Sequence, residues 1–116
     1  MLFRSPANHH MIGKAQFAKM KPTSIFVNTA RGELVDDASL ANALETDALA
    51  GAAIDVIESE HCERPGKQRL IELARVTDRL VITPHIGGNT VESMAKTEIF
   101  LANKLCAIAR LPITHN

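Results

Sequence analysis

Three short apolar segments, each followed by a loop of small or reactive residues, constrain the fold of this chain more than any other feature. They occupy residues 24–28, 51–56 and 80–83. Short apolar runs that end at turn residues are typical of buried strands, and helix-forming sequence separates these three. Strands that alternate with helices predict βαβ units with right-handed crossovers and a parallel sheet, which is an α/β fold.

Helices are expected between and around these strands. Residues 12–20 favour a short helix that stops before Pro22. Asp36 and Asp37 precede a run rich in Ala and Leu, and acidic residues ahead of good helix formers indicate a helix start. A further short helix is expected at residues 69–75.

The last helix is expected near residues 90–109, packed on the sheet. Asn89, with Glu92 three residues later, resembles a capping box at the start of this helix. One broad face of the helix carries small and apolar side chains, namely Val91, Ala95, Ile99, Ala102, Cys106 and Ala109.

Composition limits the classes of function. The 116 residues suffice for one compact core, and 46% of them are hydrophobic, which predicts a folded chain. Basic and acidic residues balance at 13 each, and the aromatic residues are four Phe without Trp or Tyr. Neither nucleic acid nor an anionic membrane is therefore expected as a partner. No apolar run approaches the ~20 residues of a membrane span. Cys62 and Cys106 have no metal or redox spacing, so we expect reduced thiols and a cytoplasmic location.

In open parallel sheets, ligands bind just beyond the carboxyl ends of the strands. The three predicted strands lead into loops that carry the candidate site residues: Thr29, Ala30, Arg31 and Gly32 after the first, Asp55 and Glu60 in and after the second, and His85, Gly87 and Gly88 after the third. Glycines in these loops let a ligand approach the backbone closely.

Arg31, Glu60 and His85 form a chemically coherent set if they meet at that edge. An arginine fork holds a carboxylate through two hydrogen bonds. A histidine exchanges a proton near neutral pH, and a neighbouring carboxylate favours its charged form. Together these groups can bind an α-keto or α-hydroxy acid and move one proton at its C2 oxygen.

Each residue also has a plainer interpretation. Arg31 can be a solvated turn residue and Glu60 a surface carboxylate. Asp55 lies in an apolar strand and needs a partner, either a ligand amide or a backbone N–H. We expect no metal site, because the remaining histidines lack ligand spacing. They are His9, His10, His61 and His115.

Three motifs resemble those of the D-isomer specific 2-hydroxyacid dehydrogenase family. Residues 20–36, MKPTSIFVNTARGELVD, are similar to the family pattern MKPxxxxVNTARGxxVD. Residues 50–56, AGAAIDV, resemble its AGAALDVF strand, and residues 83–90, TPHIGGNT, resemble its TPHIGGxT turn. The resemblance runs from about Pro6 to about Pro112, and the phosphoglycerate dehydrogenase and glyoxylate/hydroxypyruvate reductase branches look nearest.

The resemblance implies that residues 1–116 form the C-terminal half of an NAD-binding domain, a partial Rossmann-type doubly wound parallel sheet. It implies that Arg31 binds the substrate carboxylate, that His85 is the acid/base, and that Glu60 pairs with His85 and raises its pKa. It further implies a bound nicotinamide cofactor. Its contacts would be Asp55, on the carboxamide, together with Thr29, Ala30, Arg31, His85, Gly87 and Gly88.

The sequence departs from the family pattern in three respects. It contains no GxGxxG turn for the pyrophosphate and no acidic residue to recognise the adenosine ribose, so NAD and NADP both stay open. It contains no substrate domain. His61 stands where the family has Pro, and Ile57 where it has an aromatic residue. We therefore expect an incomplete oxidoreductase sequence that acts on small 2-hydroxy or 2-keto acids and comes from a family whose full-length members form homodimers. The alternative is a non-catalytic nucleotide-binding or dimerisation module.

Overall fold

The structure, a computed structural model, describes residues 6–58 and 65–109. The chain forms two compact units, Met1–His85 and Ile86–Asn116. The first unit contains the sheet and every helix up to α3, and the second contains α4.

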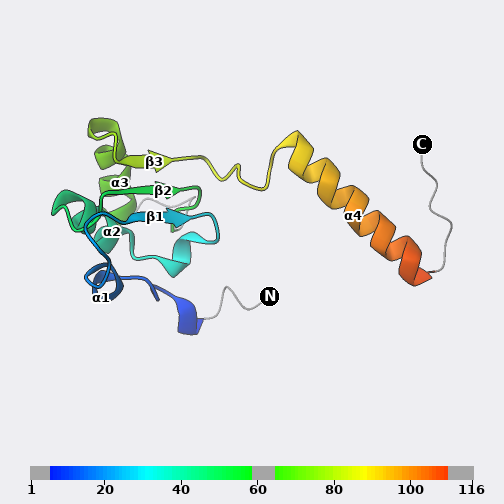
Figure 1. The fold of residues 1–116 in the computed structure, drawn as a ribbon, viewed down its shortest axis with the longest axis horizontal. Helices are drawn as coiled ribbons and strands as arrows, with labels where there is room; N and C mark the ends of the chain where they lie inside the picture. The colour runs from blue at the N-terminus through cyan, green and yellow to red at the C-terminus, as the bar shows by residue number, and fades with distance from the viewer. Residues whose placement is uncertain (1–5, 59–64, 110–116) are drawn as a thin grey trace. The chain divides into compact units, whose positions relative to one another are not determined.

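The first unit is built on a parallel sheet (Figure 1). Strands β1 (Ile25–Asn28), β2 (Gly51–Ile54) and β3 (Leu80–Ile82) lie in the order β1-β2-β3. This arrangement confirms the predicted α/β class and all three predicted strands. The hydrogen-bond ladder continues past the strand ends, because Asp55 N–H donates to the Asn28 carbonyl at 2.9 Å and Thr83 N–H to the Ile54 carbonyl at 2.9 Å.

Three helices accompany the sheet: α1 (Lys14–Phe17), α2 (Asp37–Glu45) and α3 (Pro65–Val76). The α2 start was predicted correctly, since the Asp36 side chain accepts a hydrogen bond from Ala38 N–H at 3.3 Å. Helix α1 is shorter than expected because Ile12 pairs with Val35 in an isolated parallel bridge. Helix α3 begins earlier than expected, at a proline whose missing N–H costs nothing in the first turn.

Two short 3-10 helices were not predicted, η2 (Pro6–Asn8) and η3 (Gly32–Leu34). Each is a single turn with no apolar repeat, so periodicity gave no signal for it. Helix η3 is part of the loop that follows β1, and this loop also carries Arg31.

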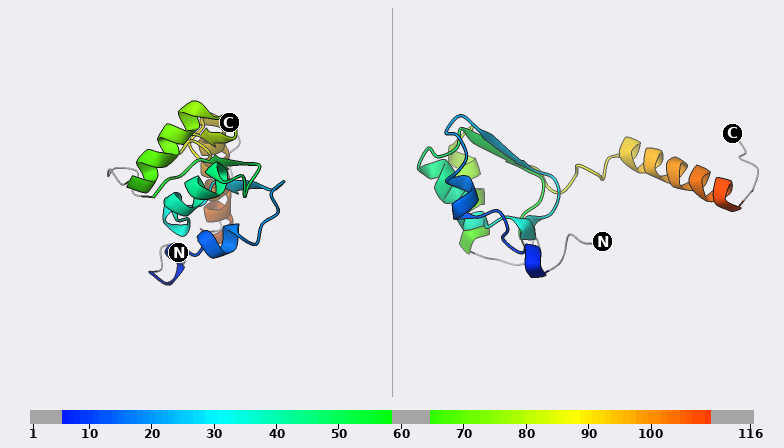
Figure 2. Two further views of the ribbon diagram at one scale, coloured as in Figure 1. Left: turned by 90° about the vertical axis from the view of Figure 1, so that its left-hand side faces the viewer. Right: turned by 60° about the horizontal axis from the view of Figure 1, so that its bottom comes forward.

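The core lies between the helices and one face of the sheet. Figure 2 shows α1, α2 and α3 on the same side of the strands. The largest fully buried side chains come from that layer: Phe17, Leu40, Leu44, Leu49 and Leu70. Phe17 of α1 meets Phe26 of β1 edge to face, with ring centroids 5.3 Å apart.

The opposite face of the sheet carries apolar side chains that the described residues of the first unit do not cover. Ile25, Val27 and Val81 are 68%, 61% and 55% exposed. Successive side chains of a strand point to opposite faces of the sheet, so Ile25 and Val27 lie on the face opposite Phe26. Phe26, Ala52 and Leu80 are register partners on the three strands, and they face the core.

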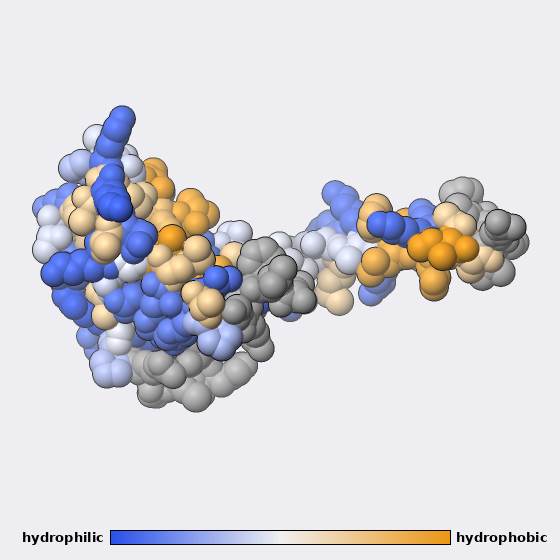
Figure 3. All heavy atoms as spheres, turned by 90° about the horizontal axis from the view of Figure 1, so that it is seen from below, coloured by the Kyte–Doolittle hydropathy of each residue, from blue (hydrophilic) through white to orange (hydrophobic). Residues whose placement is uncertain are grey.

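The second unit consists of α4 (Val91–Ala109) and the turn before it. Its cap is Thr90 rather than the predicted Asn89, because the Thr90 hydroxyl accepts from Ser93 N–H at 3.1 Å. Figure 3 shows apolar side chains along this helix, and Phe100 and Leu105 are both more than half exposed. Packing of α4 on the sheet stays a prediction. Among the described residues, no helix is both long and apolar enough to cross a membrane.

Candidate functional site

The turn after β1 presents Arg31. The buried Asn28 side chain shapes this turn, since its amide donates to the Arg31 carbonyl at 3.0 Å and its oxygen accepts from Ala30 N–H at 3.0 Å. The Arg31 guanidinium donates to the Ala30 carbonyl at 2.8 Å and is partly exposed. Asn28 was predicted only as the last residue of a strand, but its side chain also fixes the backbone that carries Arg31.

Asp55 follows β2 and is only 6% exposed. Its carboxylate accepts a hydrogen bond from the Thr83 hydroxyl at 2.5 Å. The expected partner was a ligand amide or a backbone N–H, and the structure shows a side-chain hydroxyl from the neighbouring strand end as one partner.

His85 ends the first unit in an unusual conformation. Its φ is 56°, in the left-handed region that residues other than glycine seldom adopt. Its N–H donates to the Thr83 carbonyl at 3.0 Å, and the residue is exposed. Backbone strain of this kind concentrates at functional sites.

Asp55 and His85 line the same pocket, which has a volume of about 360 Å³. This lies in the lower part of the ~300–1,000 Å³ range of small-molecule sites. Apolar side chains form much of its wall, and Lys67 of α3 adds a cation. The full lining is Asp55, Ile57, Lys67, Ile71, Ile82, Thr83, Pro84 and His85.

The other predicted site residues are distributed as follows. Thr29, Ala30 and Arg31 lie in the turn after β1 and are not part of this lining. Gly87 and Gly88 belong to the second unit. Glu60 lies outside the described residues, so its pairing with His85 stays a prediction.

Gly32 has a different role from the one expected. We expected it to admit a ligand, but the chain's own backbone occupies that space: a Cβ on Gly32 would lie 2.1 Å from the Ile57 carbonyl carbon and 2.3 Å from the Glu58 nitrogen. Glycine is needed here because the turn after β1 packs directly against the loop after β2.

A group of polar residues beside this contact was not predicted. Glu58, which was not among the predicted site residues, is buried and accepts hydrogen bonds from His9 and His10. Its backbone N–H donates to the Asp37 carboxylate, and burial raises the pKa of Asp37 to about 6, with the negative charges of Glu58 and Asp36 adding to the effect. The histidines precede Glu58 by more than 45 residues, so no local spacing could reveal the contact.

A pocket lined by polar groups from the ends of parallel strands is typical of the class of open α/β proteins that bind their ligands beyond the carboxyl edge of the sheet. Within that class, the chain belongs to the D-isomer specific 2-hydroxyacid dehydrogenase family: residues 1–87 match the family's NAD binding domain.

Named relatives agree with this assignment. The D-3-phosphoglycerate dehydrogenase of Escherichia coli is 38% identical over 103 residues, which are 87% of this chain and 24% of that protein. A D-lactate dehydrogenase from Aquifex aeolicus, solved with NAD and lactic acid, superposes with a TM-score of 0.72 at 28% identity, over 91% of this chain and 34% of that one. A glyoxylate reductase from Paecilomyes thermophila gives a TM-score of 0.67 at 36% identity, over 87% of this chain and 29% of that one.

The chain spans only part of these proteins. It covers 29% of the length of a 2-hydroxyacid dehydrogenase of Staphylococcus saprophyticus to which it is 40% identical. The match therefore concerns one region of the family fold, and that region contains the motifs quoted above.

Proposed function

We propose that this chain supplies the nicotinamide-binding and acid–base part of an NAD-dependent D-2-hydroxyacid dehydrogenase. The single observation that carries the proposal is that Asp55 and His85, from adjacent strand ends, line one pocket. The names of the relatives support a 2-hydroxy or 2-keto acid as the substrate class.

The residues around the pocket suit a nicotinamide. The Asp55 carboxylate can accept a hydrogen bond from the carboxamide NH₂, and Ile57, Ile71 and Ile82 offer an apolar wall for the flat ring. Thr29, Ala30, Gly87 and Gly88 are proposed to border the ring and its ribose. When bound, the cofactor exchanges a hydride with C2 of the substrate.

The side chains of this chain carry out the remaining steps. Arg31 holds the substrate carboxylate through its planar fork, which fixes C2 and its oxygen relative to the pocket. In reduction, the His85 imidazolium gives its proton to the C2 oxygen as that oxygen gains charge, and the neutral imidazole takes the proton back in oxidation. Glu60 is proposed to stabilise the imidazolium by its charge.

Two wider expectations accompany this proposal. A homodimer is expected for the complete family members, and the location is expected to be cytoplasmic. The choice between NAD and NADP depends on an adenosine-ribose contact, which these motifs do not include.

A chimera tests the proposal. Residues 6–109 of this chain replace the aligned segment of the Escherichia coli D-3-phosphoglycerate dehydrogenase, and NADH-dependent reduction of a panel of 2-keto acids is measured. We expect activity, and we expect Arg31→Gln and His85→Gln each to lower kcat/KM by about 100-fold or more. Arg75→Gln, an exposed change on α3, is the matched control and should have no such effect.

Two results would count against a catalytic role. A folded, active chimera that tolerates His85→Gln would remove the proposed acid/base. A folded chimera that binds NADH without turning over any 2-keto acid would favour a non-catalytic nucleotide-binding module.

A further inference from the structure

Two adjacent histidines and one buried carboxylate form a cluster that the proposed hydride chemistry does not use. The Nε2 atom of His9 lies 2.8 Å from Glu58 Oε1, and the Nε2 atom of His10 lies 3.0 Å from Glu58 Oε2. The two imidazole rings stack, with centroids 3.8 Å apart and planes inclined by 24°. One ligand atom from each residue therefore falls within 4.8 Å of the other two.

The histidine pair is held by backbone contacts on both sides. His10 N–H donates to the Glu33 carbonyl at 2.9 Å, and Ile12 N–H donates to the Leu34 carbonyl at 3.0 Å. His10 itself has a φ of 51°, which bends the chain at the pair. The imidazoles thus project from a segment that is fixed against η3.

Glu58 is also held from more than one side. Its carboxylate is nearly buried, with a side-chain exposure of 9%. The backbone of Glu58 packs against Gly32 and donates to the Asp37 carboxylate. The carboxylate therefore approaches the imidazoles from a loop that contacts elsewhere in the unit fix in place.

We propose that His9, His10 and Glu58 bind a divalent transition-metal ion, with zinc as the best match. Zinc prefers imidazole nitrogen and carboxylate oxygen in sets of three or four ligands. Bond lengths of about 2.0–2.2 Å in a tetrahedron require ligand atoms roughly 3.3 Å apart. The N···O separations of 2.8 and 3.0 Å need to open only slightly to admit the ion.

The position of the cluster defines what the ion would do. His9 and His10 precede α1, whereas Glu58 lies in the loop between β2 and α3. A bound ion would cross-link these two segments and would leave a fourth position for water or another ligand. Metal binding and the proposed dehydrogenase activity are independent, so either can fail without the other.

Hydrogen bonds alone provide the competing explanation for the same geometry. Each imidazole can donate its Nε2–H to one oxygen of the carboxylate without any ion. A metal needs both Nε2 atoms deprotonated, so zinc binding would release protons and move the ring protons to Nδ1. The two explanations therefore differ in measurable zinc affinity and in the protonation state of each ring nitrogen.

Calorimetric titration of the 116-residue chain with zinc chloride tests the proposal. We expect saturable binding of one ion per chain, and a rise in Tm on adding zinc. His9→Ala, His10→Ala and Glu58→Gln should each weaken binding by at least about tenfold. The matched control replaces the other imidazole and thiol side chains together, which are His61, Cys62, His85, Cys106 and His115, and it should keep the affinity.

Nitrogen-15 spectra of the histidine side chains provide the second measurement, and circular dichroism verifies that each variant is folded. Because His9 is exposed, His9→Ala carries the test if Glu58→Gln does not fold. Zinc should shift the Nε2 signals of His9 and His10. The proposal is overturned if no saturable binding occurs, if folded Glu58→Gln binds zinc as tightly as the parent chain, or if the control variant loses binding.

Discussion

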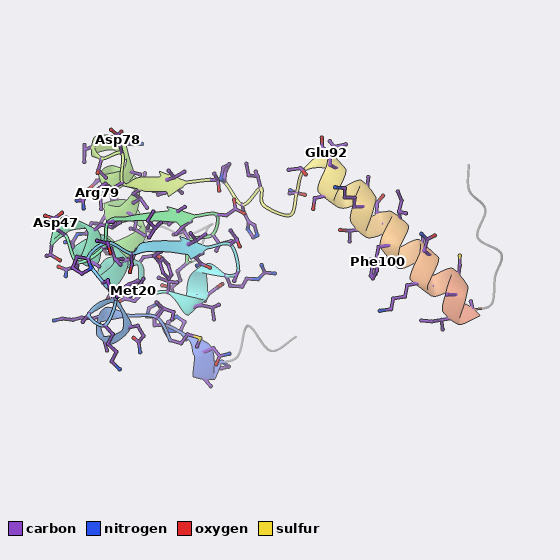
Figure 4. All side chains as sticks on the ribbon, viewed as in Figure 1. Met20, Asp47, Asp78, Arg79, Glu92 and Phe100 are labelled. Atoms are coloured by element: carbon purple, nitrogen blue, oxygen red, sulfur yellow. The ribbon has the colours of Figure 1, made fainter. Side chains whose placement is uncertain are left out.

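The two ends of the sheet use similar side chains in opposite ways. At the amino end, Arg79 stabilises the fold. Its guanidinium donates to the Leu44 carbonyl at 2.9 Å and to the Leu49 carbonyl at 3.4 Å. It also forms an ion pair with Asp47 at 2.8 Å. Figure 4 shows Arg79 and Asp47 where β2 and β3 begin. These contacts tie the last turn of α2, at Leu44, and the segment after it, at Leu49, to the start of β3.

At the carboxyl end, the polar side chains surround a pocket instead. Asp55 and His85 line a volume of about 360 Å³, and Arg31 projects from the turn after β1. Residue type alone therefore does not mark a site. The Arg79 guanidinium binds carbonyls of Leu44 and Leu49, which are distant in the sequence, and so ties separate segments together. The Arg31 guanidinium donates to the carbonyl of its chain neighbour Ala30.

The largest effect is expected where the two loops of the carboxyl end meet. Gly32→Ala would place a methyl group 2.1 Å from the Ile57 carbonyl carbon, so the backbone of one loop has to move. We expect a loss of about 3 kcal/mol or more in unfolding free energy from this overpacking. Urea unfolding provides the measurement, and Gly88→Ala is the control, because a Cβ on Gly88 meets nothing within 4 Å. Equal stability of the two variants would show that the loops are not in contact.

Substitution of Arg79 and of Arg31 tests whether the arginine at the amino end of the sheet stabilises the fold and the one at the carboxyl end does not. Arg79→Leu removes charged donors from two backbone carbonyls and should cost about 1–3 kcal/mol of stability. The exposed Asp47 pair adds little to this. Arg31→Leu should change stability by no more than about 0.5 kcal/mol, while it removes the proposed substrate contact. If thermal unfolding shows the reverse order, the roles assigned to the two ends are wrong.

The smallest expected effect concerns the outer edge of β1. Among the described residues, no strand pairs with the outer edge of β1. Ile25 and Val27 of the same strand are exposed on the open face of the sheet, next to that edge. Unguarded strand edges promote association, so we expect this chain to self-associate weakly as its concentration rises. Sedimentation across a dilution series should show this, and Val27→Lys should reduce it while the exposed Val76→Lys on α3 should not. A monodisperse monomer with a sharp, cooperative melt would show that the edge is protected.

Local signals explain which parts of the fold were predictable. The three strands are apolar runs with turn residues after them, and the start of α2 has its capping Asp36 in the sequence itself. The start of α3 was predicted too late because residues 58–68 are mostly polar and give no apolar helical repeat. The side chains of α3 that contact the core, Leu70 and Leu73, come later in the helix. The cap of α4 was displaced by one residue because Asn89 and Thr90 are both good capping residues.

Long-range contacts explain what the sequence could not reveal. Gly32 was predicted to let a ligand approach the backbone, but the backbone at Ile57 fills the space beside it. Glu58 was not among the predicted site residues, yet its carboxylate accepts hydrogen bonds from His9 and His10, which lie 49 and 48 residues earlier in the chain. Asp55 was correctly predicted to need a partner, but the Thr83 hydroxyl is identified only when β2 and β3 are aligned. Pairs of this kind depend on strand register, which one sequence does not specify.

Titration of the 116-residue chain with nicotinamide mononucleotide, followed through the backbone amide signals by NMR, tests most directly whether the carboxyl end of the sheet binds the cofactor. We expect weak, millimolar binding, with the largest shifts at Asp55, Thr83 and His85 and little change at Leu44, Asp47 and Arg79. We also expect NAD to bind no more than weakly, because the chain has no GxGxxG turn to hold the pyrophosphate. A cofactor site at the carboxyl end is contradicted if the shifts are absent there or largest around Arg79, and the weak binding of NAD is contradicted by micromolar affinity.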